Sequence, residues 1–181
     1  MKQFHSIVLA CVLAIPALAQ DTKTNAITAD VQASGQAFLA SAAILNSPLA
    51  LTNDYIYLTT AQAELPDGGK AVFNFSVTNA GNYQIETLVS APDESSNSFF
   101  VNIDAPPVDP DMIWDIPLTT GFEKRVISWR GNGDSSTDQF TPKSFKLEPG
   151  AHTLVIIGRE PGTLLKSLTI RPAPPEKPAS P

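Results

Sequence analysis

The chain has 181 residues, with 18 acidic and 12 basic side chains and a formal charge of −6 at pH 7. This length is typical of a single domain. The basic residues are too few and too dispersed to form a surface for nucleic acid or for an anionic membrane.

The first nineteen residues are predicted to be a secretory signal peptide. Lys2 gives a basic start, residues 7–15 form a short apolar stretch, and Ala17-Leu18-Ala19 is a cleavage site of the A-x-A type. The apolar stretch is too short to span a bilayer, so no membrane contact is expected after cleavage. Cleavage also removes Cys11, the only cysteine, which excludes disulfides and thiol chemistry. We expect a secreted or periplasmic monomer.

After a polar leader over residues 20–25, the stretch from 26 to 51 has a weak pattern. Its Ala-rich part, 33–45, would suit a helix, but Gly35 interrupts it and two short strands are favoured. Tyr55–Leu58 is a clearer strand, because it is short, aromatic and β-branched.

Strict alternation of apolar and polar residues predicts two half-buried strands, 70–78 and 82–90. In the first, Phe73 and Phe75 share a face with Ala71 and Val77. Asn79-Ala80-Gly81 lies between the two strands as a turn. We therefore predict that they form a β-hairpin.

The remaining strands are predicted at 99–104, at 124–130, and in three final segments between 144 and 170, and Trp114 follows a Pro- and Asp-rich loop over 105–111. Two Glu-Pro-Gly sequences, 148–150 and 160–162, predict type II turns between those final strands, with the glycine at positive φ. Residues 172–181 form a Pro-rich tail that is expected to be disordered. Together, about nine strands with little or no helix predict an all-β antiparallel sandwich, a jelly roll, over residues 26–171.

Catalytic signals are weak. The expected mature chain has one histidine, His152, no G-x-S-x-G motif, and no spacing of zinc ligands. Paired carboxylates could hydrolyse glycosides, but most of the acids concerned lie in Pro-rich loops, where they commonly form solvated turns. These acids are Asp104, Asp109, Asp111, Asp115 and Glu160. A small glycoside hydrolase is the least favoured interpretation, and no enzyme is expected.

Sugar binding would need an exposed aromatic plane beside polar side chains, because sugars combine flat C–H faces with a rim of hydroxyls. Trp129, at a strand end, and Trp114, after an acidic loop, are the two tryptophans. Each ring could equally lie in the core. Asn102, Asp104 and Asn132 are polar candidates.

Several motifs of the chain resemble those of carbohydrate-binding modules of families six and thirty-five, which are galactose-binding-like jelly rolls. The pattern F-x-L-x-x-G-x-H-T-L-x-I-x-G-R-E-x-G-T-x-L occupies residues 145–164, and related motifs occur at 81–85 and 97–104. The resemblance covers residues 26–171 and implies a non-catalytic protein that binds an oligo- or polysaccharide. It implies that Trp129 stacks on the sugar, with Trp114 as a second wall. Asn102, Asp104, Arg130 and Asn132 are then the candidate polar partners.

The chain departs from these modules at their structural calcium site. The family uses acids from its first strand and from an L-D-x-i motif in its last strand, where this chain has Lys166. An ammonium group repels Ca²⁺. We therefore predict that the calcium site is lost, although Asp30 in the first strand is an acid, and we expect no cofactor.

A second interpretation is an exported structural or protein-interaction sandwich whose sugar site has decayed. The two tryptophans discriminate between the interpretations. An exposed ring beside Asn or Asp would favour sugar binding, and burial of both rings would favour the interaction domain.

Overall fold

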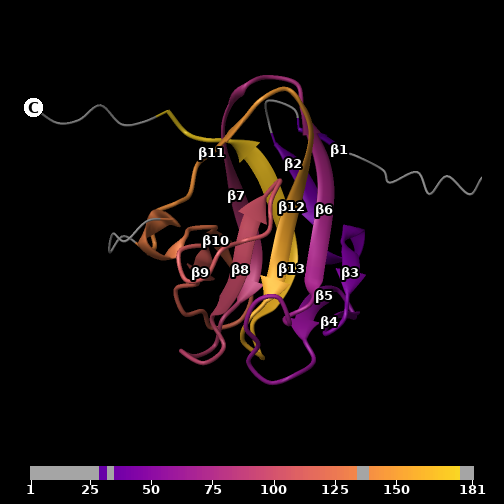
Figure 1. Cartoon of the computed structure of the whole chain (residues 1–181), viewed down its shortest axis with the longest axis vertical. Helices are drawn as coiled ribbons and strands as arrows, with labels where there is room; N and C mark the ends of the chain where they lie inside the picture. The colour runs from indigo at the N-terminus through magenta and orange to yellow at the C-terminus, as the bar shows by residue number, and fades with distance from the viewer. Residues whose placement is uncertain (1–28, 32–34, 134–138, 176–181) are drawn as a thin grey trace, which may run out of the picture.

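A computed structural model describes residues 29–31, 35–133 and 139–175. The predicted signal peptide 1–19 and polar leader 20–25 lie outside the described residues. Within the described residues, thirteen strands form two packed sheets, and the only helices are two short 3₁₀ turns, η1 (Ala40–Ala42) and η2 (Arg130–Gly133) (Figure 1). The predicted all-β sandwich is confirmed. No helix in these three segments has the length and apolar character needed to cross a membrane.

The first sheet has six strands. In order across the sheet they are β1 (Ala29–Val31), β6 (Lys70–Val77), β12 (Gly150–Gly158), β8 (Ser98–Ile103) and β9 (Ile113–Asp115), and β3 (Ile44–Asn46) also pairs with β6. The pair of β1 and β6 is parallel, whereas the other described strand pairs in both sheets are antiparallel.

The second sheet has seven strands. Its order is β10 (Glu123–Val126), β7 (Gly81–Ser90), β13 (Leu164–Pro172), β5 (Tyr55–Leu58) and β4 (Leu49–Thr52), with β11 (Phe145–Leu147) paired to β7 and β2 (Gln36–Leu39) paired to β13. The expected tail from residue 172 begins in contact with this sheet. Pro172 belongs to β13, and the Ala173 amide donates to the Asn82 carbonyl at 2.7 Å.

The predicted hairpin of β6 and β7 is wrong. Both strands alternate as expected, with Phe73, Phe75, Ile85 and Val89 in one core. However, β6 belongs to the six-stranded sheet and β7 to the seven-stranded sheet, so residues 78–80 cross between sheets. Two strands that each have one apolar face can bury those faces against each other from opposite sheets as well as side by side in one sheet.

The structure has more strands than the nine expected, because several are only three or four residues long. The weak stretch over residues 26–51 contains β1, β2, β3 and most of β4, with η1 between β2 and β3. The strand predicted over 124–130 ends at Val126. Beyond it, Ser128 forms an isolated bridge with Pro142, which has no amide hydrogen with which to extend a ladder.

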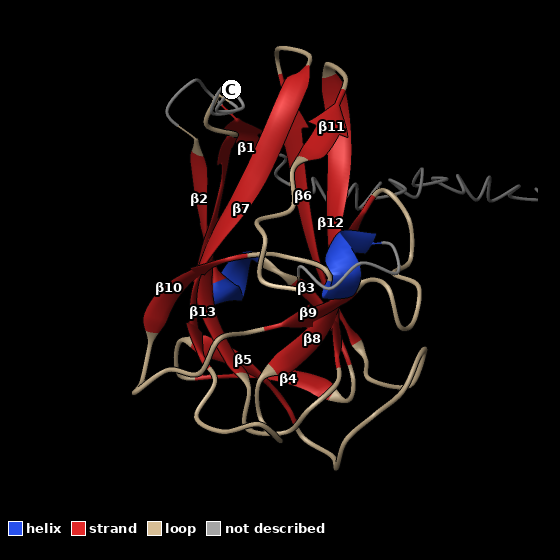
Figure 2. Ribbon diagram, turned by 90° about the vertical axis from the view of Figure 1, so that its left-hand side faces the viewer, coloured by secondary structure: helices blue, strands red, loops and turns tan. Residues whose placement is uncertain are grey.

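Loops gather at the end of the sandwich where β12 passes into β13 and β7 into β8 (Figure 2). There, a Cβ built on Gly68 would lie 1.7 Å from the Gly158 carbonyl oxygen, so only glycine permits this approach of two backbones. Both predicted turn glycines have positive φ, 139° at Gly150 and 84° at Gly162. The turn at Gly162 holds two charged side chains of the candidate site.

Candidate functional site

The two tryptophans are both buried, so the prediction of an exposed ring is wrong. Trp114 is 0% exposed and Trp129 is 7% exposed. The Trp114 ring stacks on Phe99 at 6.2 Å between ring centroids. Large aromatic rings contribute most to a sandwich core when they are removed from water, and here both β9 and the segment between β10 and η2 place their tryptophan inside.

Trp129 is fixed on several sides. Its Nε1–H donates to the Val101 carbonyl at 2.7 Å, and its ring meets Phe145 edge-on at 5.4 Å between centroids. The Lys143 ammonium lies 4.2 Å from the ring centroid. The residue therefore joins β8, β11 and the loop before β11, which is a structural role.

Asn102 and Asp104 shape the end of β8. The Asn102 side chain donates to the Pro106 carbonyl at 3.3 Å and accepts from the Ile103 amide at 2.8 Å. Asp104, at a φ of 62°, accepts the Thr153 amide at 2.8 Å. Each of these polar groups has its hydrogen bond within the fold.

His152 belongs to the same corner of the molecule. Its Nδ1 lies 2.6 Å from Asp104 Oδ2, and its Nε2 lies 2.7 Å from the Glu148 carbonyl oxygen. Burial lowers the pKa of His152, but the hydrogen bonds to Asp104 and Glu148 outweigh it and raise the pKa above its ordinary value of 6.5. An imidazolium satisfies both acceptors at once, so the pair fastens β12 to β8.

Asn132 lies in η2 at a φ of 53°, beside a second hollow lined by Gln84, Ser144 and Pro174. Its Oδ1 is buried and has no hydrogen-bond partner among the described residues. The six residues predicted from sequence therefore do not come together. Two tryptophans are in the core, two polar residues close a turn, and Asn132 lines a different hollow from Arg130.

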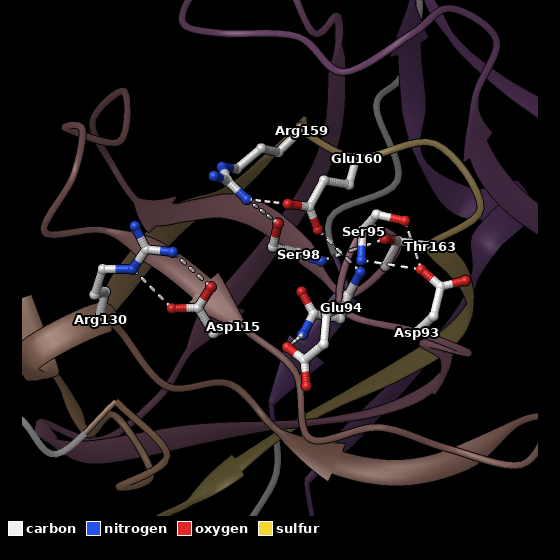
Figure 3. Close-up of polar contacts among 10 residues, drawn as sticks. Asp93, Glu94, Ser95, Ser98, Asp115, Arg130, Arg159, Glu160 and Thr163 are labelled. Carbon is white, nitrogen blue, oxygen red and sulfur yellow. Dashed lines mark hydrogen bonds and ion pairs between the residues drawn. The ribbon is translucent and has the colours of Figure 1, made fainter.

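Arg130 is the predicted residue that lies in a built site. Its Nε and Nη2 each donate to Asp115 over 2.8 Å, one to Oδ2 and the other to Oδ1, so the two side chains form a fork (Figure 3). The hydrogen bond to Asp115 raises the pKa of Arg130, and burial partly opposes this. Nη1 takes no part in this fork.

A second charged pair comes from the turn between β12 and β13. Arg159 Nη1 donates to Glu160 Oε1 and, at 2.6 Å, to the Ser98 hydroxyl. Glu160 Oε2 accepts the Asn97 amide at 3.0 Å, and the Thr163 hydroxyl accepts the Ser98 amide at 3.3 Å. This network ties the turn to the start of β8 (Figure 3).

These pairs line a hollow of about 390 Å³, which we call the polar pocket. Its walls are Glu94, Asn97, Asp115, Ile116, Pro117, Leu118, Arg130, Gln139, Phe140, Arg159 and Glu160. Phe140 lines the pocket and is 54% exposed, which makes it the most exposed large aromatic side chain among the described residues. Residues on both sides hold it, since the Ser128 hydroxyl donates to the Gln139 carbonyl at 2.5 Å and Ser128 bridges Pro142.

The residues around Lys166 do not suit calcium. The Lys166 ammonium pairs with Asp54 at 2.6 Å and lies 5.3 Å from the centroid of the Phe122 ring. A cation already occupies the place where the resemblance implies a carboxylate ligand, and Asp54 is engaged by it. Loss of the calcium site stays a prediction.

No protein-family model matches the chain, and no curated protein matches it. Among solved structures, the chain is similar to a family 35 carbohydrate-binding module from Clostridium thermocellum, with a TM-score of 0.56 and 15% identity over 78% of this chain and 100% of that one. A β-(1,4)-mannanase from Podospora anserina that combines GH26 and CBM35 is also similar, with a TM-score of 0.56 and 15% identity over 81% of this chain and 29% of that one. An exo-β-1,3-galactanase from Phanerochaete chrysosporium, solved with galactose, has a TM-score of 0.51 and 14% identity over 76% of this chain and 29% of that one.

The chain therefore has the fold of a carbohydrate-binding module, as predicted from its sequence motifs. It spans 29% of the length of the two enzymes named above. At these identities the similarity concerns the fold, and the function must be argued from the polar pocket.

Proposed function

We propose that this protein is an exported, non-catalytic sugar-binding protein whose binding site is the polar pocket. The observation that carries the proposal is an exposed aromatic ring, Phe140, beside two fixed guanidinium–carboxylate pairs in one hollow. Export is inferred from the signal peptide predicted at residues 1–19. The carbohydrate-binding-module fold supports the proposal.

The pocket combines the two kinds of contact that a sugar needs. The Phe140 ring offers an apolar plane for the C–H face of a pyranose. Arg130, Asp115 and Glu160 offer planar donors and acceptors to vicinal hydroxyls, and their mutual bonds hold them in place before a ligand arrives. Such preorganisation lowers the entropy lost on binding.

The same bonds argue against glycoside hydrolysis. A general acid needs a proton on an oxygen that faces the glycosidic bond, and a proton placed on any of these oxygens would compete with the donor that the oxygen already faces. Both oxygens of Asp115 accept from Arg130, and the two oxygens of Glu160 accept from Arg159 and the Asn97 amide. These carboxylates are arranged as fixed acceptors.

A glycan array and polysaccharide affinity gels test the proposal. We expect the protein to bind at least one neutral or amino glycan, and we expect Phe140→Ala to weaken that binding by roughly 5- to 150-fold, the equivalent of about 1–3 kcal/mol for an aromatic stack. Leu39→Ala is the matched control, since Leu39 is 67% exposed on β2 and does not line the pocket. Equal effects of the two substitutions would place the sugar elsewhere.

One observation favours a second function. Burial of both tryptophans is the outcome expected for a sandwich that binds protein instead of sugar. Apolar side chains are exposed on three short strands, at Leu39 in β2, Ile44 in β3 and Leu51 in β4. Failure of the folded protein to bind any glycan on the array would leave this second function as the better account.

A further inference from the structure

The polar pocket has more negative than positive charge. Three carboxylates line it, Glu94, Asp115 and Glu160, against the two guanidinium groups of Arg130 and Arg159. Asp115 is paired with Arg130, and Glu160 with Arg159. Glu94 is left over.

Among the described residues, no cationic side chain lies within ion-pair distance of Glu94. From the described residues, its carboxylate receives one long hydrogen bond, 3.4 Å, from the Asn97 side-chain amide. A carboxylate in this situation keeps most of its capacity to accept hydrogen bonds and to pair with a ligand's charge.

The loop that carries Glu94 is held in place. Asp93 Oδ1 accepts the Ser95 amide at 2.9 Å and the Ser95 hydroxyl at 2.7 Å, and the Ser96 amide donates to the Asp93 carbonyl at 3.0 Å. The side-chain hydrogen bond from Ser95 is the main cause of the lowered pKa of Asp93. Glu94 is therefore presented to the pocket by a closed turn (Figure 3).

The surroundings add to the negative potential. Asp109 and Glu160 act on Arg130 through space, in addition to its partner Asp115. The chain as a whole has a charge of −6. An anionic sugar would meet this field at close range, with both guanidinium groups already occupied by carboxylates.

We propose that the polar pocket selects its sugar by charge, in the order amino sugar, neutral sugar, uronate, and that Glu94 is the residue that sets this order. The inference rests on the proposed function. Glu94 pairs with the ammonium of a 2-amino-2-deoxy sugar, accepts a hydroxyl of a neutral sugar, and repels the carboxylate of a uronate.

The test uses nine multivalent sugar conjugates on one surface. Glucose, galactose and mannose are each presented in neutral, 2-amino-2-deoxy and uronic form, and binding is measured at about pH 6, where the amine is protonated. Within the sugar series that binds, the affinity should fall by about two- to fivefold from the amino sugar to the neutral sugar and again to the uronate, as expected for exposed charges. The steps should shrink when salt is raised.

Glu94→Gln should remove the advantage of the amino sugar while the neutral sugar still binds. Glu64→Gln is the matched control, because it makes the same change of charge at an exposed residue that does not line the pocket. Equal or tighter binding of the uronate, or an amino-sugar advantage that survives Glu94→Gln, would overturn the inference and leave the proposed function standing. Absence of binding to all nine conjugates by the folded protein would overturn both.

Discussion

Replacing Trp129 by phenylalanine separates a core role from a binding role. The substitution keeps a ring in contact with Phe145 but removes the Nε1–H that donates to Val101 at 2.7 Å. Leaving that buried carbonyl without its donor costs about 1–3 kcal/mol. At roughly 2–4 °C per kcal/mol for a chain of this size, the melting temperature should fall by about 2–12 °C.

Phe140→Ala should behave in the opposite way. Its ring is 54% exposed, so the expected change in stability is within about 0.5 kcal/mol, and the melting temperature should hardly move. Thermal unfolding followed by circular dichroism, together with glycan binding at a temperature where all variants are folded, measures both properties. Full stability with lost binding in Trp129→Phe would refute the argument, since that is the result expected if the sugar stacks on Trp129.

Three further experiments, two with substitutions and one with calcium, test other parts of the fold. His152→Gln should flatten the pH dependence of stability. Because the pKa of His152 is raised in the folded protein, its bond to Asp104 stabilises the fold below pH 6.5, and this contribution is lost as the pH rises through the raised pKa. Unfolding in urea from pH 5 to 9, compared between the two proteins, measures the difference. Micromolar calcium should leave the melting temperature unchanged, and a stabilisation of several degrees would show that Lys166 does not abolish the calcium site. Gly68→Ala should destabilise the folded protein by about 1–3 kcal/mol or more, because its Cβ would overlap the Gly158 carbonyl. Gly81→Ala is the control, since its added Cβ meets its nearest atom at 3.8 Å and should not clash. Equal denaturation midpoints for the two variants would contradict the close approach of the backbones at Gly68 and Gly158.

Strands that bury one face along eight or more residues were predictable from the sequence. β6 and β7 alternate cleanly, and the turn glycines at the start of β12 and after its end have the expected positive φ. The alternation of apolar and polar residues shows which side chains of a strand face the core, but it does not show which other strand is hydrogen-bonded to it. For this reason the faces of β6 and β7 were predicted correctly and their pairing was not.

The pocket was not predictable because its contacts join distant parts of the chain. Glu160 meets the Asn97 amide across 63 positions, and Arg130 meets Asp115 across 15. Phe140 lies in a segment whose Gly, Asp and Ser residues indicate only a long polar loop. The acids at 115 and 160 were noted for possible catalysis, and the structure reveals them as partners of arginines.

The tryptophans and the pocket are linked by the chain itself. Trp114 precedes Asp115 in β9, and Trp129 precedes Arg130 at the start of η2, so at both places a buried indole is followed directly by one half of the charged fork. The indoles thereby fix the backbone from which the fork projects. A large truncation of either tryptophan would displace the fork and weaken sugar binding even though no sugar touches the ring. Loss of binding in a tryptophan-to-alanine variant is therefore compatible with both roles, and only a substitution that keeps the ring and removes one hydrogen bond can distinguish them.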